Sequence, residues 1–284
     1  MLDLDEDPGF CSGTLYTNIG RFDMIGAIAG DMIGSVYEAR PIKKKDFPLF
    51  HPACQFTDDS VLTIAVARAI LEDKDYRRWV LEIGRRYPNA GYGGSFIRWL
   101  RAESPEPYGS WGNGSAMRAS PVGFAFDDTE TVAAEAARSA AISHDHPEGI
   151  KGAQAAAVAV FAARTLRNKT IVKDEIQRRF GYDLNRSIDR IRPGYRFEVS
   201  CRKSVPEAII AFLESESYED AVRNAVSLGG DADTQACIAG GIAEAYYGGI
   251  PKGMVQEVKN RLTPELWEIV EHFYARFCMT METD

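Results

Sequence analysis

The sequence predicts one compact, all-α domain, and three observations support this fold class. Ala and Gly are abundant while long β-branched runs are few, which favours closely packed helices over a sandwich or barrel. Apolar residues recur at helical spacing in several segments, without an alternation of strands and helices and without an internal repeat. A chain of 284 residues is near the upper size for one domain and can bury a large core without disulfide or metal support.

The composition excludes several classes of protein. Hydrophobic residues make up 45% and charged residues 26% of the chain, which excludes wholesale disorder. The formal net charge of −8 argues against non-specific affinity for nucleic acids or anionic membranes. The five cysteines are odd in number and form no CxxC pair, as expected for reduced thiols. Because no apolar stretch is long enough to span a bilayer and no signal-peptide pattern occurs, we expect a cytoplasmic protein.

The N-terminal third begins with two segments of different character. Residues 1–23 are acidic and then rich in Gly, Ser, Thr and Asn, so we expect either a flexible extension or sequence upstream of a natural start near Met24, before a domain over 24–284. Residues 24–39 are apolar or small on nearly every side, as in a helix buried within a bundle. A Pro- and Lys-rich loop follows over 41–56. The next helix is predicted from the apolar spacing over 62–70, with a cap at Asp58, Asp59 or Ser60.

The middle of the chain combines glycine-rich loops with further helices. Two such loops, at 88–95 and 104–116, flank a short helical segment. Asp127 and Glu130 form a capping pattern before a helix that ends at Ala141. Pro147 is predicted at the start of the helix that follows.

The C-terminal third is predicted to be mostly helical after one irregular stretch. Residues 181–204 show the least helical pattern. Helices are then expected from Pro206, from Ser217 to near Ser227, over 238–246, and from about Pro264 to Phe277. The whole chain is therefore expected to hold about ten helical segments.

A first candidate site lies where the second helix starts. Thr57, Asp58 and Asp59 offer one hydroxyl and two carboxylates in a row, a set of oxygen ligands that suits Mg²⁺ or Mn²⁺. Taken alone, the segment is more simply explained as a charged helix cap.

A second candidate lies in the segment GGDADT. Asp231 and Asp233 are two positions apart, so they converge on one ion only where the backbone is still turning, as Gly229 and Gly230 permit. This segment alone is again explained by a cap. Together, the two segments would bring four carboxylates close to one another, and their mutual repulsion favours a site for two divalent ions.

Three further segments contain candidate residues. Glu38 follows an apolar helix and is either a general acid or base or a solvated residue at the helix end. Asp31 is interpreted as a buried carboxylate whose hydrogen bonds are satisfied within the protein or as a residue that supports the ligands, and not as a ligand. The run SWGNGSAMR exposes backbone N–H groups that suit a phosphate, although it is not a P-loop, and a bare loop explains it as well. The run SHDHPE carries His144 and His146, for which contact with a ligand is more plausible than metal binding, and a loop histidine without a role is the simplest interpretation from this run alone. No context supports a covalent Ser or Cys nucleophile.

These segments together resemble a known family. The ADP-ribosylglycohydrolases, which include dinitrogenase-reductase-activating glycohydrolase and the vertebrate ADP-ribosylhydrolases, show the same order and similar intervals of GAIAGDMIGSVYE, FTDDS, SWGNGSAMRASPVG, SHDHPEG and SLGGDADTQA. The resemblance covers Met24 to Ile250 and excludes residues 1–23. It implies an all-α fold with two central Mg²⁺ or Mn²⁺ ions.

The resemblance also implies a role for individual residues. Glu38 matches an acid on a loop beside the metals, and Glu38 and Asp59 are the implied catalytic residues. His144 matches a histidine of the ADP-ribose pocket, and Ser60 stands where many members have Thr. The implied diphosphate and ribose loop comprises Gly112, Asn113, Gly114 and Ser115. The implied metal ligands are Thr57, Asp58, Asp59, Asp231, Asp233 and Thr234.

The implied activity is metal-dependent hydrolysis of the bond between ADP-ribose and a modified acceptor, which reverses ADP-ribosylation. An arginine side chain is slightly favoured as acceptor, while serine, O-acetyl-ADP-ribose, poly(ADP-ribose) and nucleic-acid adducts stay open. The expected partners are thus ADP-ribose or an ADP-ribosylated protein or small molecule, with no membrane. Two other interpretations stay open, a non-catalytic binder of ADP-ribose and a di-metal phosphoesterase acting on a nucleotide.

Overall fold

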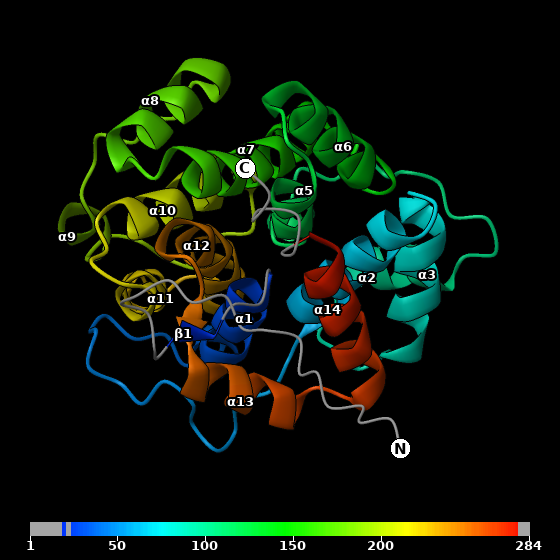
Figure 1. Cartoon of the computed structure of the whole chain (residues 1–284), viewed down its shortest axis with the longest axis horizontal. Coiled ribbons are helices and arrows are strands. Elements are labelled where there is room, and N and C mark those ends of the chain that lie inside the picture. The colour runs from blue at the N-terminus through cyan, green and yellow to red at the C-terminus, as the bar shows by residue number, and fades with distance from the viewer. Residues whose placement is uncertain (1–18, 21–23, 278–284) are drawn as a thin grey trace, which may run out of the picture.

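Helices make up nearly all of the regular structure of the protein (Figure 1), as seen in a computed structural model that describes residues 19–20 and 24–277. Within these residues the structure contains fourteen α-helices, a short 3-10 helix over Asn113–Ser115 and two very short strands. The predicted all-α fold class is confirmed. The helices of the N-terminal half are α1 (Ile25–Glu38), α2 (Asp58–Leu71), α3 (Tyr76–Arg86), α4 (Gly94–Arg101), α5 (Ser120–Ala125), α6 (Thr129–Ala141) and α7 (Pro147–Leu166).

The C-terminal half continues with seven more helices. Strand β1 (Ile19–Gly20) pairs antiparallel with β2 (Ile250–Pro251), and the rest of the predicted extension over 1–23 lies outside the described residues. The helices are α8 (Lys169–Phe180), α9 (Ile188–Ile191), α10 (Cys201–Leu213), α11 (Tyr218–Ser227), α12 (Ala232–Tyr247), α13 (Lys252–Arg261) and α14 (Pro264–Phe277).

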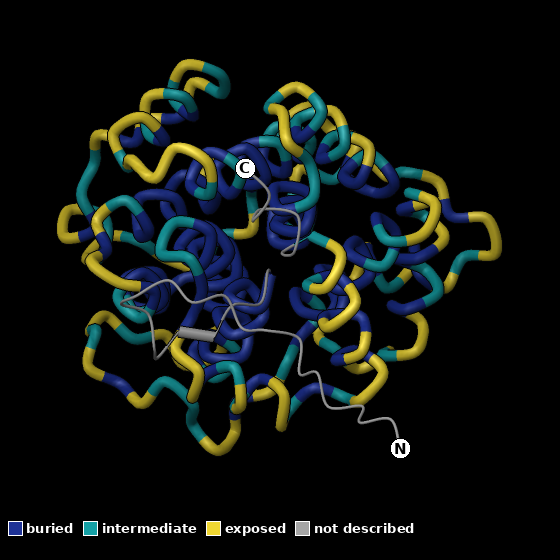
Figure 2. The backbone as a smooth tube through the Cα atoms, in the orientation of Figure 1, coloured by how far each residue is buried: buried dark blue, intermediate teal, exposed yellow. Residues whose placement is uncertain are grey.

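Two helices form the centre of the domain, and both are buried along almost their whole length (Figure 2). Helices α1 and α12 run antiparallel with their backbones in contact. A Cβ placed on Gly30 would lie 2.1 Å from the carbonyl oxygen of Ala236, and one on Gly34 would lie 2.4 Å from that of Ala232. This close approach places the last turn of α1, which carries Glu38, beside the first turn of α12.

The contact between α1 and α12 leads to a prediction for stability. We expect Gly30→Ala to lower the free energy of unfolding by about 3 kcal/mol or more, because the new methyl group meets rigid backbone and the helices must separate. Gly253→Ala on α13 is the matched control, since a Cβ there meets no atom within 4 Å. Urea unfolding measures both variants. Equal stability of Gly30→Ala and the native protein would contradict this packing.

Several local predictions were wrong, each because tertiary contacts override a local signal. The described residues form more helices than the expected ten. One that was not predicted is α3, because its many charged residues hide the helical spacing of the buried residues Trp79, Val80 and Ile83 in the sequence. Pro206 does not open a helix, because α10 begins at Cys201 and holds the proline inside a buried face.

The predicted caps of two helices are each displaced by one residue. Asp128 caps α6 in place of Asp127, because its side chain accepts a hydrogen bond from the backbone N–H of Thr131. Thr57 caps α2 in place of the residues after it, and its side chain accepts from the N–H of Asp59. Thus both cap residues lie outside the first helical turn, where their extended backbone lets the side chain reach the free N–H groups.

Candidate active site

The predicted site residues gather at one cavity of about 540 Å³. Its floor is formed by the end of α1 and the first turns of α2 and α12, and the loop before α5 forms a wall. The sequence-predicted residues that line it are Glu38, Thr57, Asp58, Asp59, Asp231, Asp233, Thr234, Gly112, Asn113, Gly114 and His144.

Asp31 holds the start of α2 against α1. Its carboxylate accepts hydrogen bonds from the N–H of Thr57 at 2.9 Å and the hydroxyl of Thr57 at 2.6 Å. It also accepts from the N–H of Ser60 at 3.1 Å and from the hydroxyl of Ser60. Burial nevertheless raises the pKa of Asp31 to about 6, while these hydrogen bonds lower it. This carboxylate therefore positions the Thr57 segment.

The two aspartates that open α2 differ in environment. Asp59 is buried, and its Oδ1 has no hydrogen-bond partner among the described residues. Burial, followed by the charges of Asp31 and Asp58, raises the pKa of Asp59 far above its ordinary value. Asp58 is partly exposed, and desolvation together with neighbouring carboxylates raises its pKa to about 8. An orphaned, buried carboxylate oxygen is the kind of atom that a bound cation satisfies.

The turn before α12 brings its aspartates to the same place. Gly229 has a φ of 63°, a left-handed conformation that glycine adopts without strain. Asp231 is the residue before the first helical turn, and its Oδ2 accepts a 2.8 Å hydrogen bond from Nδ2 of Asn113. Oδ1 of Asp233 accepts from the N–H of Thr234 at 2.9 Å. The turning backbone thus lets both carboxylates face the cavity.

The carboxylates converge in two overlapping groups. Ligand oxygens of Asp31, Asp59 and Asp233 lie within 4.8 Å of one another, as do those of Glu38, Asp231 and Asp233. Burial and then the charges of Asp59 and Asp231 raise the pKa of Asp233, and burial and then the charge of Asp231 raise that of Glu38. Such a cluster is unfavourable without cations, and its all-oxygen donor set fits hard divalent ions and not zinc.

Neither the predicted loop residue Ser115 nor His146, to which the resemblance assigns no role, is placed for binding in the cavity. Ser115 is fully buried beneath the loop, where its hydroxyl donates to the carbonyl oxygen of Gly149 at 2.7 Å. Its side chain therefore stabilises the loop and is not available to a ligand. His146 caps α7, because its Nδ1 accepts from the N–H of Glu148 at 3.1 Å. By contrast, Asn113 is anchored by its N–H to the carbonyl of Val199 at 2.7 Å and faces the aspartates.

The cavity has an aromatic rim that was not predicted. Trp111 is 49% exposed and Phe197 is 57% exposed, and both line the cavity together with Tyr108 and Val199. Exposed aromatic rings beside a polar cavity suit a flat organic group. Trp111 and Tyr108 lie within the predicted glycine-rich loop 104–116, so their signal was available. Phe197 lies in the irregular stretch 181–204 and had none.

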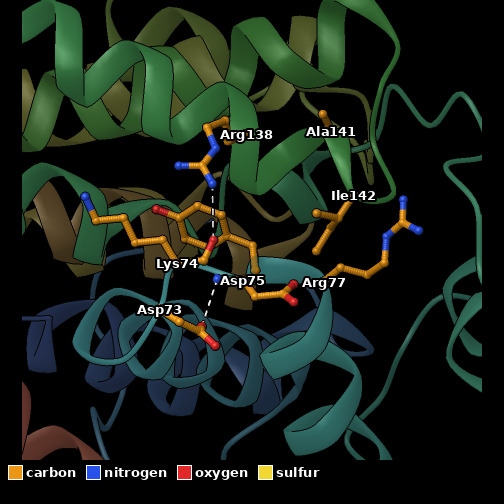
Figure 3. Close-up of a pocket in the computed structure, with 8 residues that line it drawn as sticks. Asp73, Lys74, Asp75, Arg77, Arg138, Ala141 and Ile142 are labelled. Carbon is orange, nitrogen blue, oxygen red and sulfur yellow. Dashed lines mark hydrogen bonds between the residues drawn. The ribbon is translucent and has the colours of Figure 1, made fainter.

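A second hollow has different chemistry (Figure 3). It measures about 490 Å³ and lies between the α2–α3 connection and the end of α6. Its polar groups bond to one another, since the N–H of Asp75 donates to Asp73 and the guanidinium of Arg138 donates to the carbonyl of Lys74. None of the predicted site residues lies there, so we assign it no ligand. Among the described residues, no helix is both long and apolar enough to cross a membrane.

Comparisons with known proteins agree on one family. The family model described as ADP-ribosylglycohydrolase matches residues 23–282. The chain is 27% identical to ADP-ribosylhydrolase ARH3 of Gallus gallus, with 79% of this chain and 84% of that protein covered. It is 26% identical to an uncharacterized protein of Archaeoglobus fulgidus, with 87% and 95% covered. A solved structure described as an ADP-ribosylglycohydrolase-related protein complex superposes with a TM-score of 0.69 at 25% identity, covering 91% of this chain and 96% of that one.

Proposed function

Because this chain belongs to the ADP-ribosylglycohydrolase family and is therefore a hydrolase of glycosidic bonds, we propose that it releases ADP-ribose from a modified acceptor. The observation that carries the proposal is the convergence of carboxylates from three helices opposite a glycine-rich loop in one cavity. The carboxylates are placed to bind ions and move protons at the ribose, where the bond to the acceptor is cleaved, and the loop is placed to bind the diphosphate.

Two Mg²⁺ or Mn²⁺ ions would be held by the oxygen donors of the floor. The residues that would hold them are Thr57, Asp58, Asp59, Asp231, Asp233 and Thr234. Divalent ions in such a site orient the hydroxyls of a sugar and make a bound water more acidic. The orphaned Oδ1 of Asp59 supports this proposal, since a cation is the simplest partner for it.

The side chains divide the chemistry between them. Cleavage at the anomeric carbon develops positive charge on the ribose ring, and water must lose a proton as it attacks. Glu38 is the exposed carboxylate at the edge of the cluster, so it is positioned to accept that proton or to protonate the leaving group. Asp59, which is buried and lines the same cavity, would stabilise the positive charge of the ribose.

The remaining walls would bind the rest of ADP-ribose. Gly112 and Gly114 let a diphosphate approach the loop backbone, and His144 lines the same wall. The exposed rings of Trp111 and Phe197 offer apolar faces on which an adenine base could stack. We propose arginine as the first acceptor to test, because the accessible carboxylates of Glu38 and Asp58 suit a cationic group.

The direct test incubates the protein with defined ADP-ribosylated arginine, serine and O-acetyl substrates, with Mg²⁺, with Mn²⁺ or with a chelator. We expect mass spectrometry to detect free ADP-ribose when Mg²⁺ or Mn²⁺ is present and to detect none when the chelator is present. Release of AMP would instead indicate a phosphoesterase. Binding of ADP-ribose without release from any acceptor would indicate a non-catalytic binder, and either result would overturn the proposal.

A further inference from the structure

We propose that Arg118 is a positioning residue of this site. Acting through the hydroxyl of Ser143, it holds His144 as a neutral ring with its proton on Nε2, so that the ring donates a hydrogen bond to an oxygen of the substrate diphosphate. The identity of that ligand rests on the proposed function. The state of the ring does not, and it can be measured in the free protein.

The first observation is an unusual buried charge. Arg118 is fully buried, lines the cavity, and has no partner for Nε and Nη1 within the described part of the chain. Its Nη2 donates at 3.0 Å to the carbonyl oxygen of Ser139 and at 3.0 Å to the hydroxyl oxygen of Ser143. The described residues place no carboxylate within ion-pair distance of it. A buried cation of this kind is costly unless an anion approaches it, and the cavity provides room for one.

The second observation is the order of donors and acceptors. A guanidinium can only donate hydrogen bonds, so the Ser143 oxygen accepts from Arg118. Oγ of Ser143 lies 2.8 Å from Nδ1 of His144, so the hydroxyl proton, which the bond from Arg118 does not use, can point at that nitrogen. We assign this direction to the bond. Nδ1 then accepts, and a neutral ring carries its proton on Nε2.

The surroundings of the ring keep it neutral. Burial and then the positive charge of Arg118 lower the pKa of His144 well below its ordinary value. Tyr108 also packs against the ring, with its ring centroid 5.9 Å away, and its own pKa is raised by burial. Neither Arg118 nor a neutral Tyr108 favours an imidazolium at neutral pH.

The third observation is the direction of Nε2. A Cβ placed on Gly114 would lie 3.2 Å from Nε2 of His144, and one on Gly112 would lie 3.7 Å from it. Nε2 therefore faces the two glycines of the loop that we assign to the diphosphate. A neutral donor at this point, with the charge of Arg118 behind it, suits an anionic oxygen.

The decisive measurement is long-range ¹H–¹⁵N NMR of the free protein. The chain has only four histidines, and a His144→Gln variant identifies the signals of His144. We expect a proton on Nε2 and none on Nδ1, still at about pH 6, below the usual pKa of about 6.5. A proton on Nδ1 of the native ring, alone or together with one on Nε2, would overturn the proposal whether or not the protein proves to be a hydrolase.

Affinity for ADP-ribose, measured by calorimetry, tests the relay, by which we mean the chain of hydrogen bonds from Arg118 through Ser143 to His144. Ser143→Ala should weaken binding about tenfold, as expected when a hydrogen bond to a charged group is lost, whereas Ser143→Thr should restore it. Ser204→Ala is the matched control, since it removes another buried hydroxyl, which donates to the carbonyl of Ser200. Arg118→Met should weaken binding as much as Ser143→Ala does. If Arg118→Met does not fold, the affinity of Ser143→Ala alone tests whether the chain of hydrogen bonds from Arg118 to His144 supports binding. Native affinity in Ser143→Ala would refute the relay.

Discussion

Asp233→Asn is expected to make the metal-free protein more stable while abolishing hydrolysis. Asp233 belongs to both groups of converging carboxylates, and its pKa is raised by burial and by Asp59 and Asp231. At neutral pH the metal-free protein bears either the repulsion of an ionised Asp233 or the free-energy cost of protonating it. A neutral amide avoids both and keeps the Oδ1 that accepts from the N–H of Thr234. We expect a gain of about 1–2 kcal/mol without metal, seen as a rise of a few degrees in melting temperature.

Added Mg²⁺ or Mn²⁺ should reverse the order of stability. The native protein should gain about 2.7 kcal/mol when the free ion exceeds its dissociation constant a hundredfold, whereas Asp233→Asn should gain little. Asp174→Asn removes an acidic charge from the exposed face of α8 and should behave as native. Thermal unfolding with and without the ions checks all three proteins. An equal response of native and Asp233→Asn protein to the ions would exclude Asp233 as a ligand.

Glu38→Gln should lower kcat by about 100-fold or more and leave the affinity for ADP-ribose nearly unchanged. A carboxylate that moves a proton in the transition state contributes to kcat and adds little to ground-state binding. Glu38 is the last residue of α1 and is exposed, so the amide should not disturb the core. Steady-state release of ADP-ribose gives kcat, and calorimetry gives the affinity.

The control for Glu38 is an acid of similar exposure outside the cavity. Glu103→Gln neutralises an exposed glutamate that does not line the site, so its kcat should equal that of the native protein. If Glu38→Gln retained native kcat, the proton would have to be carried by another group. In that case the carboxylate of Asp58, the other accessible acid of the cavity, would be the next one to replace.

Several features of the fold were predictable because their signals are local. Apolar and small residues on nearly every side of 24–39 predict a buried helix, and α1 occupies Ile25–Glu38. The helical spacing over 62–70 and 238–246 likewise predicts parts of α2 and α12. Local signals failed where packing compensates for an unfavourable residue, as at Pro206 within α10. They also failed for α3, which is stabilised by packing one narrow apolar face on its neighbours.

The amino-acid sequence by itself determined the chemistry of the candidate site. Runs of Thr and Asp specify an oxygen-rich donor set, glycines before Asp231 permit the necessary turn, and the motif order identifies the family. These properties belong to a few neighbouring residues, so they can be read without knowledge of the fold.

Only the tertiary structure decided which side chains face the cavity. Ser115 belongs to the predicted glycine-rich loop 104–116 but is buried beneath it, while Arg118, three positions later, lies behind His144. Glu38 meets Asp231 and Asp233 because α1 and α12 touch through backbone atoms at Gly30 and Gly34. Residues about two hundred positions apart are brought together by the packing of whole helices, and a pattern within one segment carries no information about its partner.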